Sequence, residues 1–143
     1  MTLPVITVRN LQRKSSLNIT ELQKFAANAV KCCFQLHKSK RTDLCKLREI
    51  FVWLISDWRM SGLHRKFLGE TGPTDVITFH DGEIFISVET AGRYARQFGN
   101  SLTREIKLDI VHGLLHLHGF DDKTPAAAKT MRKAENKVLR CAG

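Results

Sequence analysis

The segment from Ser101 to Asp122 constrains the fold more than any other part of this 143-residue chain. Its apolar residues recur with the period of an amphipathic helix and form one stripe: Leu102, Ile106, Ile110, Leu114 and Leu117. Ser101 is a favourable helix cap, and Glu105 suits the positive end of the helix dipole. Gly119 can adopt the left-handed conformation that ends a helix. The segment therefore predicts a helix that buries one face against a core.

Two histidines on this helix form a candidate metal site. His112 and His116 are four residues apart, so their side chains lie about 40° apart around the axis and one turn apart along it. Beyond Gly119 the chain can turn back and bring Asp121 or Asp122 to them. Three protein ligands with one open position are typical of a catalytic zinc site. The alternative is a pair of surface histidines with this spacing by chance.

The residue after the first histidine argues against a peptidase. Zinc peptidases with the H-E-x-x-H motif use the Glu as general base, whereas this chain has Gly113 there. Glycine inside a helix costs about 1 kcal/mol relative to Ala. We therefore expect a substrate or a neighbouring strand to approach the backbone closely at Gly113.

The sequence His112 to Asp122, HGLLHLHGFDD, resembles the signature H-G-x-L-H-L-x-G-[YF]-D-H of the YbeY family of endoribonucleases. The resemblance implies a metal-dependent enzyme, associated with the ribosomal small subunit, that cuts single-stranded RNA and matures the 3′ end of its rRNA. It implies that His112, His116 and Asp122 bind one divalent ion, most readily Zn²⁺, and that metal-activated water attacks the phosphodiester. Asp122 replaces the third histidine of the family, which adds a negative charge and favours harder ions.

A second motif supports the same resemblance and also departs from it. The segment Pro73 to Phe79, PTDVITF, is similar to the family sequence P-T-D-V-L-S-F, but upstream Leu68 stands where the family usually has Arg. A cation near the metal would bind the scissile phosphate. We expect Arg65 to serve as this catalytic cation, with Arg59 and Lys66 contacting RNA. The alternative is that all three are surface charges on a short helix.

Two neighbours of the histidine pair have weaker claims to the metal. A helix that continued through His118 would direct it about 160° away from His116, so we expect a partly exposed residue that favours the negative end of the helix dipole. Asp109 lies one turn before His112 and could orient its imidazole, although a solvated carboxylate is the simpler interpretation.

The charge of the chain suits RNA as a partner. Lys and Arg outnumber Asp and Glu by 23 to 14, which gives a formal net charge of +9. Three residues of a predicted basic helix face are candidates for RNA binding: Lys129, Arg132 and Lys133. The basic segment 37–41 is either another RNA-contacting loop or a solvated turn. Charge alone does not distinguish these interpretations.

The rest of the composition excludes several classes of protein. No run of about 18 apolar residues exists, so we expect no membrane span, and the N-terminus does not resemble a secretory signal. We therefore expect a cytoplasmic protein, or one in an organelle, without an organic cofactor. None of the four cysteines belongs to a C-x-x-C pair, which predicts buried thiols rather than disulfides or metal ligands.

Hydrophobic periodicity predicts an α+β fold. Four segments are expected as strands: Val5–Val8, Glu49–Ile55, Thr74–Phe79 and Gly82–Ser87. The nearly continuous apolar run Glu49–Ile55 is typical of a strand buried on both faces, and Asp81-Gly82 suits a tight hairpin between the last two strands. Five are expected as helices: 19–36, 57–68, 88–98, 101–118 and 126–140. They predict one domain over residues 1–143, with a small mixed four-stranded sheet, about five packed helices, and the metal site on a helix and the turn after it. The resemblance implies the same architecture.

Two other functions remain open from the sequence. One is a metal-dependent hydrolase of another kind, which the lack of a Glu at Gly113 and the basic balance disfavour. The other is a non-catalytic, ribosome-associated RNA-binding factor with a structural metal. The departures at Asp122 and Leu68 favour this second alternative.

Overall fold

The computed structural model describes residues 2–36 and 41–143, so the expectation for the basic segment 37–41 falls almost entirely outside the described residues. The strands form one sheet in the order β1-β2-β4-β3. Their bounds are β1 (Val5–Asn10), β2 (Glu49–Ile55), β3 (Val76–Thr78) and β4 (Glu83–Ser87). The first three strands in this order are parallel, whereas β3 is antiparallel to β4. The predicted mixed sheet and its hairpin are confirmed.

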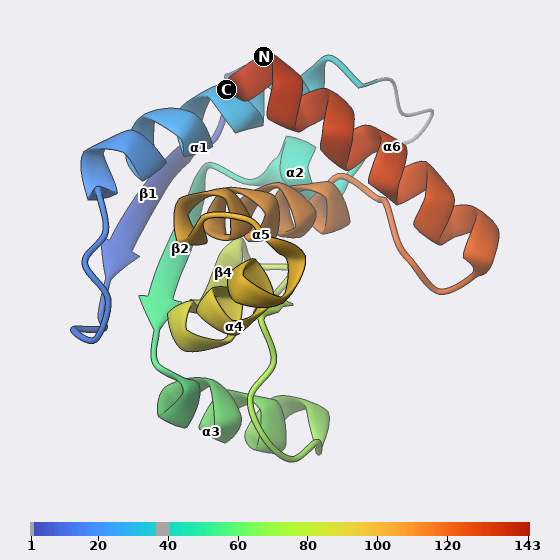
Figure 1. Cartoon of the computed structure of the whole chain (residues 1–143). Helices are drawn as coiled ribbons and strands as arrows, with labels where there is room; N and C mark the ends of the chain where they lie inside the picture. The colour runs from blue at the N-terminus through green and yellow to red at the C-terminus, as the bar shows by residue number, and fades with distance from the viewer. Residues whose placement is uncertain (1, 37–40) are drawn as a thin grey trace.

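The described residues form six helices. Their bounds are α1 (Ile19–Phe34), α2 (Asp43–Lys46), α3 (Asp57–Leu68), α4 (Val88–Phe98), α5 (Leu102–Leu117) and α6 (Pro125–Ala142). The helix missed by the sequence analysis is α2, because four residues are too few to display a helical period. Contacts join α1 to β1, α5 to β3 and β4, and α6 to both α1 and α5 (Figure 1). Among the residues that the structure describes, no helix combines the length and the apolar character needed to cross a membrane.

The two faces of β2 differ in burial, which corrects the expectation of a strand buried on both faces. Ile50, Val52 and Leu54 are fully buried in the main core. The alternate residues Phe51 and Trp53 are only half-buried and stack on each other, with ring centroids 5.5 Å apart. Helices α1 and α5 cover one face of the sheet, and the other face is only partly covered.

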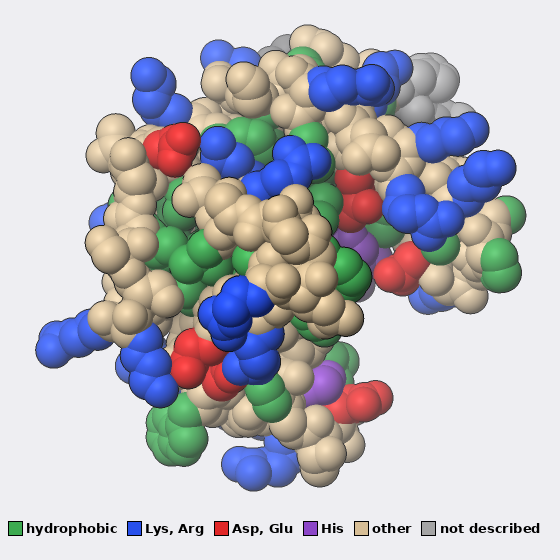
Figure 2. Space-filling view, viewed as in Figure 1, with side chains coloured by type: hydrophobic (Ala, Val, Ile, Leu, Met, Phe, Trp, Pro, Cys, Tyr) green, Lys and Arg blue, Asp and Glu red, His purple; other side chains and the backbone are tan. Residues whose placement is uncertain are grey.

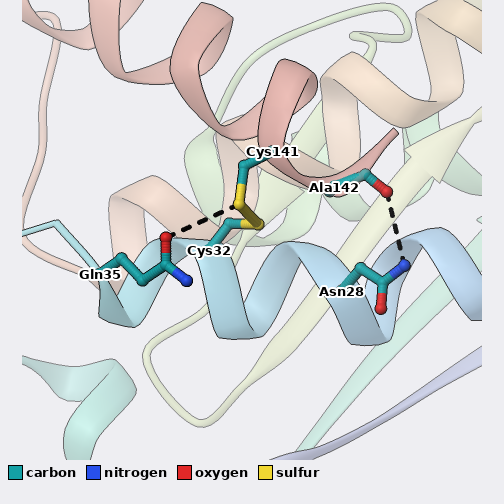
Figure 3. Close-up of a disulfide and its surroundings, with 5 residues drawn as sticks. All are labelled: Asn28, Cys32, Gln35, Cys141 and Ala142. Carbon is teal, nitrogen blue, oxygen red and sulfur yellow. Dashed lines mark hydrogen bonds between the residues drawn. A yellow bond between two sulfur atoms is a disulfide. The ribbon is translucent and has the colours of Figure 1, made fainter.

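A disulfide joins α1 to α6, which corrects the prediction that all the cysteines are thiols. Cys32 and Cys141 are bonded across a sequence separation of 109 residues (Figure 3). The Asn28 side-chain amide also donates to the carbonyl of Ala142, 3.5 Å away. Local sequence could not reveal this pair, because only the packing of α6 on α1 brings the two cysteines together. Cys33 and Cys45 remain thiols, and burial raises the pKa of Cys33 to about 12.

Candidate metal centre

Helix α5 presents the histidine pair as its sequence predicts. At its start, the Ser101 hydroxyl accepts a hydrogen bond from the Arg104 N–H at 3.1 Å. Ile106, Ile110 and Leu114 of the apolar stripe are fully buried, and both histidines stand beside the stripe, half-buried. The helix ends at Leu117, and Gly119 has a positive φ of 88°. The chain therefore turns back toward the histidines, as expected.

Hydrogen bonds fix the orientation of both imidazoles. The Nδ1 of His112 lies 2.8 Å from Oε2 of Glu135, and the Nδ1 of His116 lies 3.1 Å from the carbonyl oxygen of Phe120. Carboxylate and carbonyl oxygens only accept, so each Nδ1 carries a proton and each neutral ring has a lone pair on Nε2. The two Nε2 atoms face each other at 3.0 Å. Two nitrogen ligands of a tetrahedral zinc ion would lie about 3.3 Å apart, so this arrangement fits a shared cation.

The third expected ligand lies beside them. One ligand atom from each of His112, His116 and Asp122 falls within 4.8 Å of the other two. Among the described residues, these three are the group of His, Cys, Asp or Glu side chains whose ligand atoms lie close enough together to share a metal ion. Two imidazole nitrogens and one carboxylate oxygen suit a divalent ion such as zinc, and they leave a position open. The residues present therefore fit the metal that the sequence predicts.

The two histidines differ in their affinity for protons. Burial disfavours the charged form of His112, but the hydrogen bond and charge of Glu135 and the charge of Asp122 raise the pKa of His112 above its ordinary value. Burial and the charge of His112 lower the pKa of His116. The pair therefore accepts its first proton at His112.

Glu135 was missed by the sequence analysis. It lies on α6, and its side chain is only 13% exposed where it meets His112. A carboxylate behind a ligating histidine fixes the ring and increases its basicity. A signal existed, because Glu135 is the one acidic residue in α6, whose other charged residues are all Lys or Arg.

Gly113 lies where β3 and β4 approach α5. A Cβ atom at this position would lie 2.9 Å from two carbons of the Ile84 side chain and 3.0 Å from the Thr78 hydroxyl. The expectation of a close neighbour is confirmed, and the neighbours are side chains of the sheet. A residue larger than glycine would push apart the helix and the strands that form the site.

Asp109 is buried, which corrects the expectation of a solvated carboxylate. It is 4% exposed, and its Oδ2 has no hydrogen-bond partner within the described parts of the chain. Burial, followed by the charge of Asp75, raises the pKa of Asp109 well above its ordinary value. Asp109, Asp75 and Glu135 line a cavity next to His112. Burial therefore favours the neutral form of Asp109.

His118 lies apart from the metal ligands, as expected, but it is buried rather than partly exposed. Only 3% of it is accessible to solvent. Its Nε2 lies 3.1 Å from the carbonyl oxygen of Leu36, and its Nδ1 lies 2.9 Å from the Thr42 hydroxyl. The ring thus donates from Nε2 and accepts at Nδ1. It joins the end of α5 to the segments on either side of residues 37–40.

The three candidate ligands open onto a cleft with a volume of about 520 Å³. Strand β3, at the edge of the sheet, lines one side, and the loop from Leu117 to Lys123 lines the other. Leu68, the last residue of α3, also lines the cleft and is 55% exposed. The cleft is therefore open to solvent beside the histidines.

Comparison with known proteins agrees with this architecture. A family model described as Endoribonuclease YbeY matches residues 7–143. The chain belongs to the YbeY family. A solved structure, the solution structure of TM1509 from Thermotoga maritima, shares the fold with a TM-score of 0.62 and 24% identity, covering 94% of this chain and 89% of that one.

Relatives in the YbeY family come from bacteria and a plant. Endoribonuclease YbeY of Frankia alni is 30% identical, with 86% of this chain matching 72% of that protein. The protein of the same name from Bacteroides thetaiotaomicron is 38% identical over 66% of this chain and 74% of its own length. Endoribonuclease YBEY, chloroplastic, of Arabidopsis thaliana is 30% identical, and 94% of this chain matches 26% of that longer protein.

The cation that lines this cleft is not one of those named in the sequence analysis. The side chain that lines the cleft from α3 is Leu68, whereas Arg59, Arg65 and Lys66 are not among the residues lining it. Lys123 is the one Lys or Arg among the described residues that does line the cleft. No local pattern singled out Lys123, because its role depends on how the loop after α5 returns.

The other predicted RNA-binding residues lie on α6. Lys129, Arg132 and Lys133 are exposed there and do not line the cleft. Helix α6 starts three residues after Asp122, so its basic side chains come soon after the loop that carries this candidate ligand.

Proposed function

We propose that this chain is a metal-dependent endoribonuclease that hydrolyses single-stranded RNA. One observation carries the proposal: the Nε2 atoms of His112 and His116, 3.0 Å apart, and the Asp122 carboxylate converge at an open cleft in a chain of the YbeY endoribonuclease family. The fit of these donors favours Zn²⁺ as the ion. Maturation of the 3′ end of small-subunit rRNA and ribosome quality control are the proposed roles, with the ribosomal small subunit as partner.

The residues of the site would have different roles in the reaction. His112, His116 and Asp122 would hold the ion, and Glu135 holds the ring of His112 with Nε2 facing the cleft. A bound divalent ion supplies Lewis acidity, which activates water and polarises a phosphoryl oxygen. Lys123 lies where it can neutralise charge on the scissile phosphate, and Arg65 remains a proposed alternative.

RNA outside the cleft would contact basic residues on two helices. Arg59 and Lys66 of α3 and Lys129, Arg132 and Lys133 of α6 are all exposed, which supports a role in binding phosphates. We also propose that residues 1–143 act as one domain and that the protein works in the cytoplasm.

The test measures metal content and cleavage on the same samples. Wild-type protein should hold about one divalent ion per chain and cut a single-stranded RNA. His116→Ala and Asp122→Ala should each lose the ion and the cleavage together. A wild-type protein that cuts RNA equally well after its metal has been removed by a chelator would contradict the proposal, and so would an Asp122→Ala variant that keeps both its metal and its activity.

The second candidate function is a non-catalytic RNA-binding factor with a structural metal. The presence of Asp122 and Leu68, where the resemblance implies His and Arg, favours it. His112→Ala separates the two functions: an enzyme should lose cleavage but keep its RNA affinity. If the protein is a binding factor, the wild type itself should bind metal and RNA but show no metal-dependent cleavage. Identification of a 2′,3′-cyclic phosphate product would reject direct attack by water.

A further inference from the structure

A second groove, lined by cations, lies between α5 and α6. Its lining residues are Arg104, Lys133, Asn136, Lys137, Leu139 and Arg140. The groove has a volume of about 690 Å³, compared with about 520 Å³ for the metal cleft, and no acidic residue lines it. Its four Lys or Arg side chains come from two consecutive helices, and the packing of α6 against α5 brings Arg104 beside the cations of α6.

In the part of the chain that the structure describes, these four cations have no carboxylate partners. Ion pairs engage Lys14, Arg93 and Lys107, but none engages Arg104, Lys133, Lys137 or Arg140 within residues 2–36 and 41–143. All four are exposed. Like charges around one groove repel each other, and a bound polyanion would remove that repulsion.

Arg104 is also placed against the preference of its own helix. It lies in the first turn of α5, where the positive end of the helix dipole favours acidic side chains. The backbone N–H of Arg104 caps against Ser101, while its guanidinium extends to the groove. The residue therefore adds to the positive potential rather than to the stability of the helix.

A row of lysines runs along α6 from the end that follows Asp122 to the groove. Lys129, Lys133 and Lys137 are four residues apart, so they lie on one side of α6 and about 6 Å apart along its axis. Figure 2 shows Lys and Arg side chains gathered along α6. The row begins just after the loop that carries Asp122, and Glu135 of the same helix contacts His112.

The distance between the two sites suits a short length of single-stranded RNA. Arg104 and His112 are eight residues apart on α5, which corresponds to roughly 12 Å along the helix axis. Grooves that follow a single strand typically hold about 4–16 nucleotides. A strand with its scissile phosphate at the metal site could therefore extend along α6 into the groove.

We propose that Arg104, Lys133, Lys137 and Arg140 form an auxiliary site that binds the phosphate backbone of RNA a few nucleotides away from the bond to be cut. The inference rests on the proposed ribonuclease function and adds a substrate-length requirement to it. Because the contacts are to phosphates, the site reads charge and not base sequence.

The test compares two triple variants of equal charge. The groove variant carries Lys133→Gln, Lys137→Gln and Arg140→Gln, since Gln retains helix propensity. The control carries Arg9→Gln, Arg13→Gln and Arg48→Gln, three exposed cations near the β1 edge of the sheet. Binding of fluorescent single-stranded RNAs of 5 and 20 nucleotides is measured with EDTA, and cleavage with zinc. If circular dichroism shows that the groove variant is poorly folded, Arg104→Gln on α5 replaces it in the test.

The groove variant should bind the 20-nucleotide RNA at least 10-fold more weakly than the control. The slope of log Kd against log salt should fall by about 2, because each phosphate contact on a single strand contributes about 0.7. The loss in kcat/KM should be at least five-fold greater for the long RNA than for the short one. The proposal would be wrong if the groove variant and the control variant bound RNA equally well. It would also be wrong if the groove variant lost the same factor in kcat/KM on the short RNA as on the long one.

Failure of the proposed function would look different. If wild-type protein cuts no RNA but the groove variant alone loses affinity, the groove is supported and the nuclease is not. If wild-type protein cuts both RNAs and the groove variant matches the control, the nuclease stands and the groove is rejected. Wild-type protein that does not bind the 20-nucleotide RNA would reject the groove directly.

Discussion

Single residues behind the histidines determine whether the pair can bind a metal. The Nδ1 atoms of His112 and His116 donate to Glu135 and to the Phe120 carbonyl, which leaves both Nε2 lone pairs directed at one point. A ring without its acceptor would be free to turn or to change tautomer. Glu135 therefore matters to the site although it is not a ligand.

Glu135→Ala should weaken zinc binding by about 10- to 100-fold, because His112 loses the acceptor that orients it. Glu135→Gln should weaken zinc binding less, since the amide oxygen of Gln can still accept the hydrogen bond from Nδ1 of His112. The affinity can be measured on metal-free protein by competition with a chromogenic chelator. Thr130→Ala, an exposed substitution on the same helix, is the control. Unchanged zinc affinity in Glu135→Ala would contradict this role.

Lys123→Gln should reduce kcat/KM for RNA about 10-fold, or about 1.4 kcal/mol in transition-state stabilisation, without changing metal content. The reason is that Lys123 is the described Lys or Arg that lines the cleft. Adding Leu68→Arg, from the opposite wall, should recover part of the loss. If Arg65→Gln is impaired instead and Lys123→Gln is not, the prediction made from the sequence holds and Lys123 has no such role.

At the scale of helices and strands, the site depends on α3 and α4 staying in place beside the sheet. Asp57, at the start of α3, binds the hydroxyl of Thr90 at 2.7 Å and the guanidinium of Arg93 at 2.8 Å, and both partners belong to α4. It also accepts a hydrogen bond from Ser87 at the end of β4. Burial opposes the charge on Asp57, but these partners lower its pKa below the ordinary value.

Asp57→Asn should lower the free energy of unfolding by about 1.5–3 kcal/mol at pH 7, because it removes charged hydrogen bonds that join three elements. The folded-state pKa of Asp57 is below that of the unfolded chain, so its contribution is present above about pH 4 and is lost as pH falls through the folded value. Urea unfolding at pH 7, 4 and 3 should therefore show the difference between wild type and variant shrinking. Glu70→Gln, exposed on a loop, is the control, and a difference independent of pH would contradict the argument.

At the scale of the whole molecule, α6 is attached at both ends. At its start, α6 is joined to α5 by the loop that carries Asp122. Near its end, Cys141 is bonded to Cys32 of α1. Between them Glu135 reaches His112. The position of this helix therefore couples the core to the metal centre and to the cationic groove.

Cys141→Ser should lower the free energy of unfolding under oxidising conditions by about 2–4 kcal/mol, because the bond closes a long loop in the unfolded chain. Dithiothreitol should destabilise wild type by a similar amount and should not affect the variant. Cys45→Ser, which leaves the bond intact, should respond to dithiothreitol as wild type does. Thiol titration of unreduced, denatured protein should find two free cysteines, and a count of four would contradict the disulfide.

The sequence by itself determined the strands, the five longer helices and the histidine pair, because all of these depend on interactions between near neighbours. Period and caps placed α5 and the hairpin, and a four-residue spacing placed His112 beside His116. Only the tertiary structure decided the acceptor behind His112, the burial of Asp109, the partner of Cys32 and the cation in the cleft. Glu135 and Cys141 are far along the chain from the residues that they contact, and Lys123 depends on the path of a loop. Such contacts arise from the packing of whole helices, so no local pattern could report them.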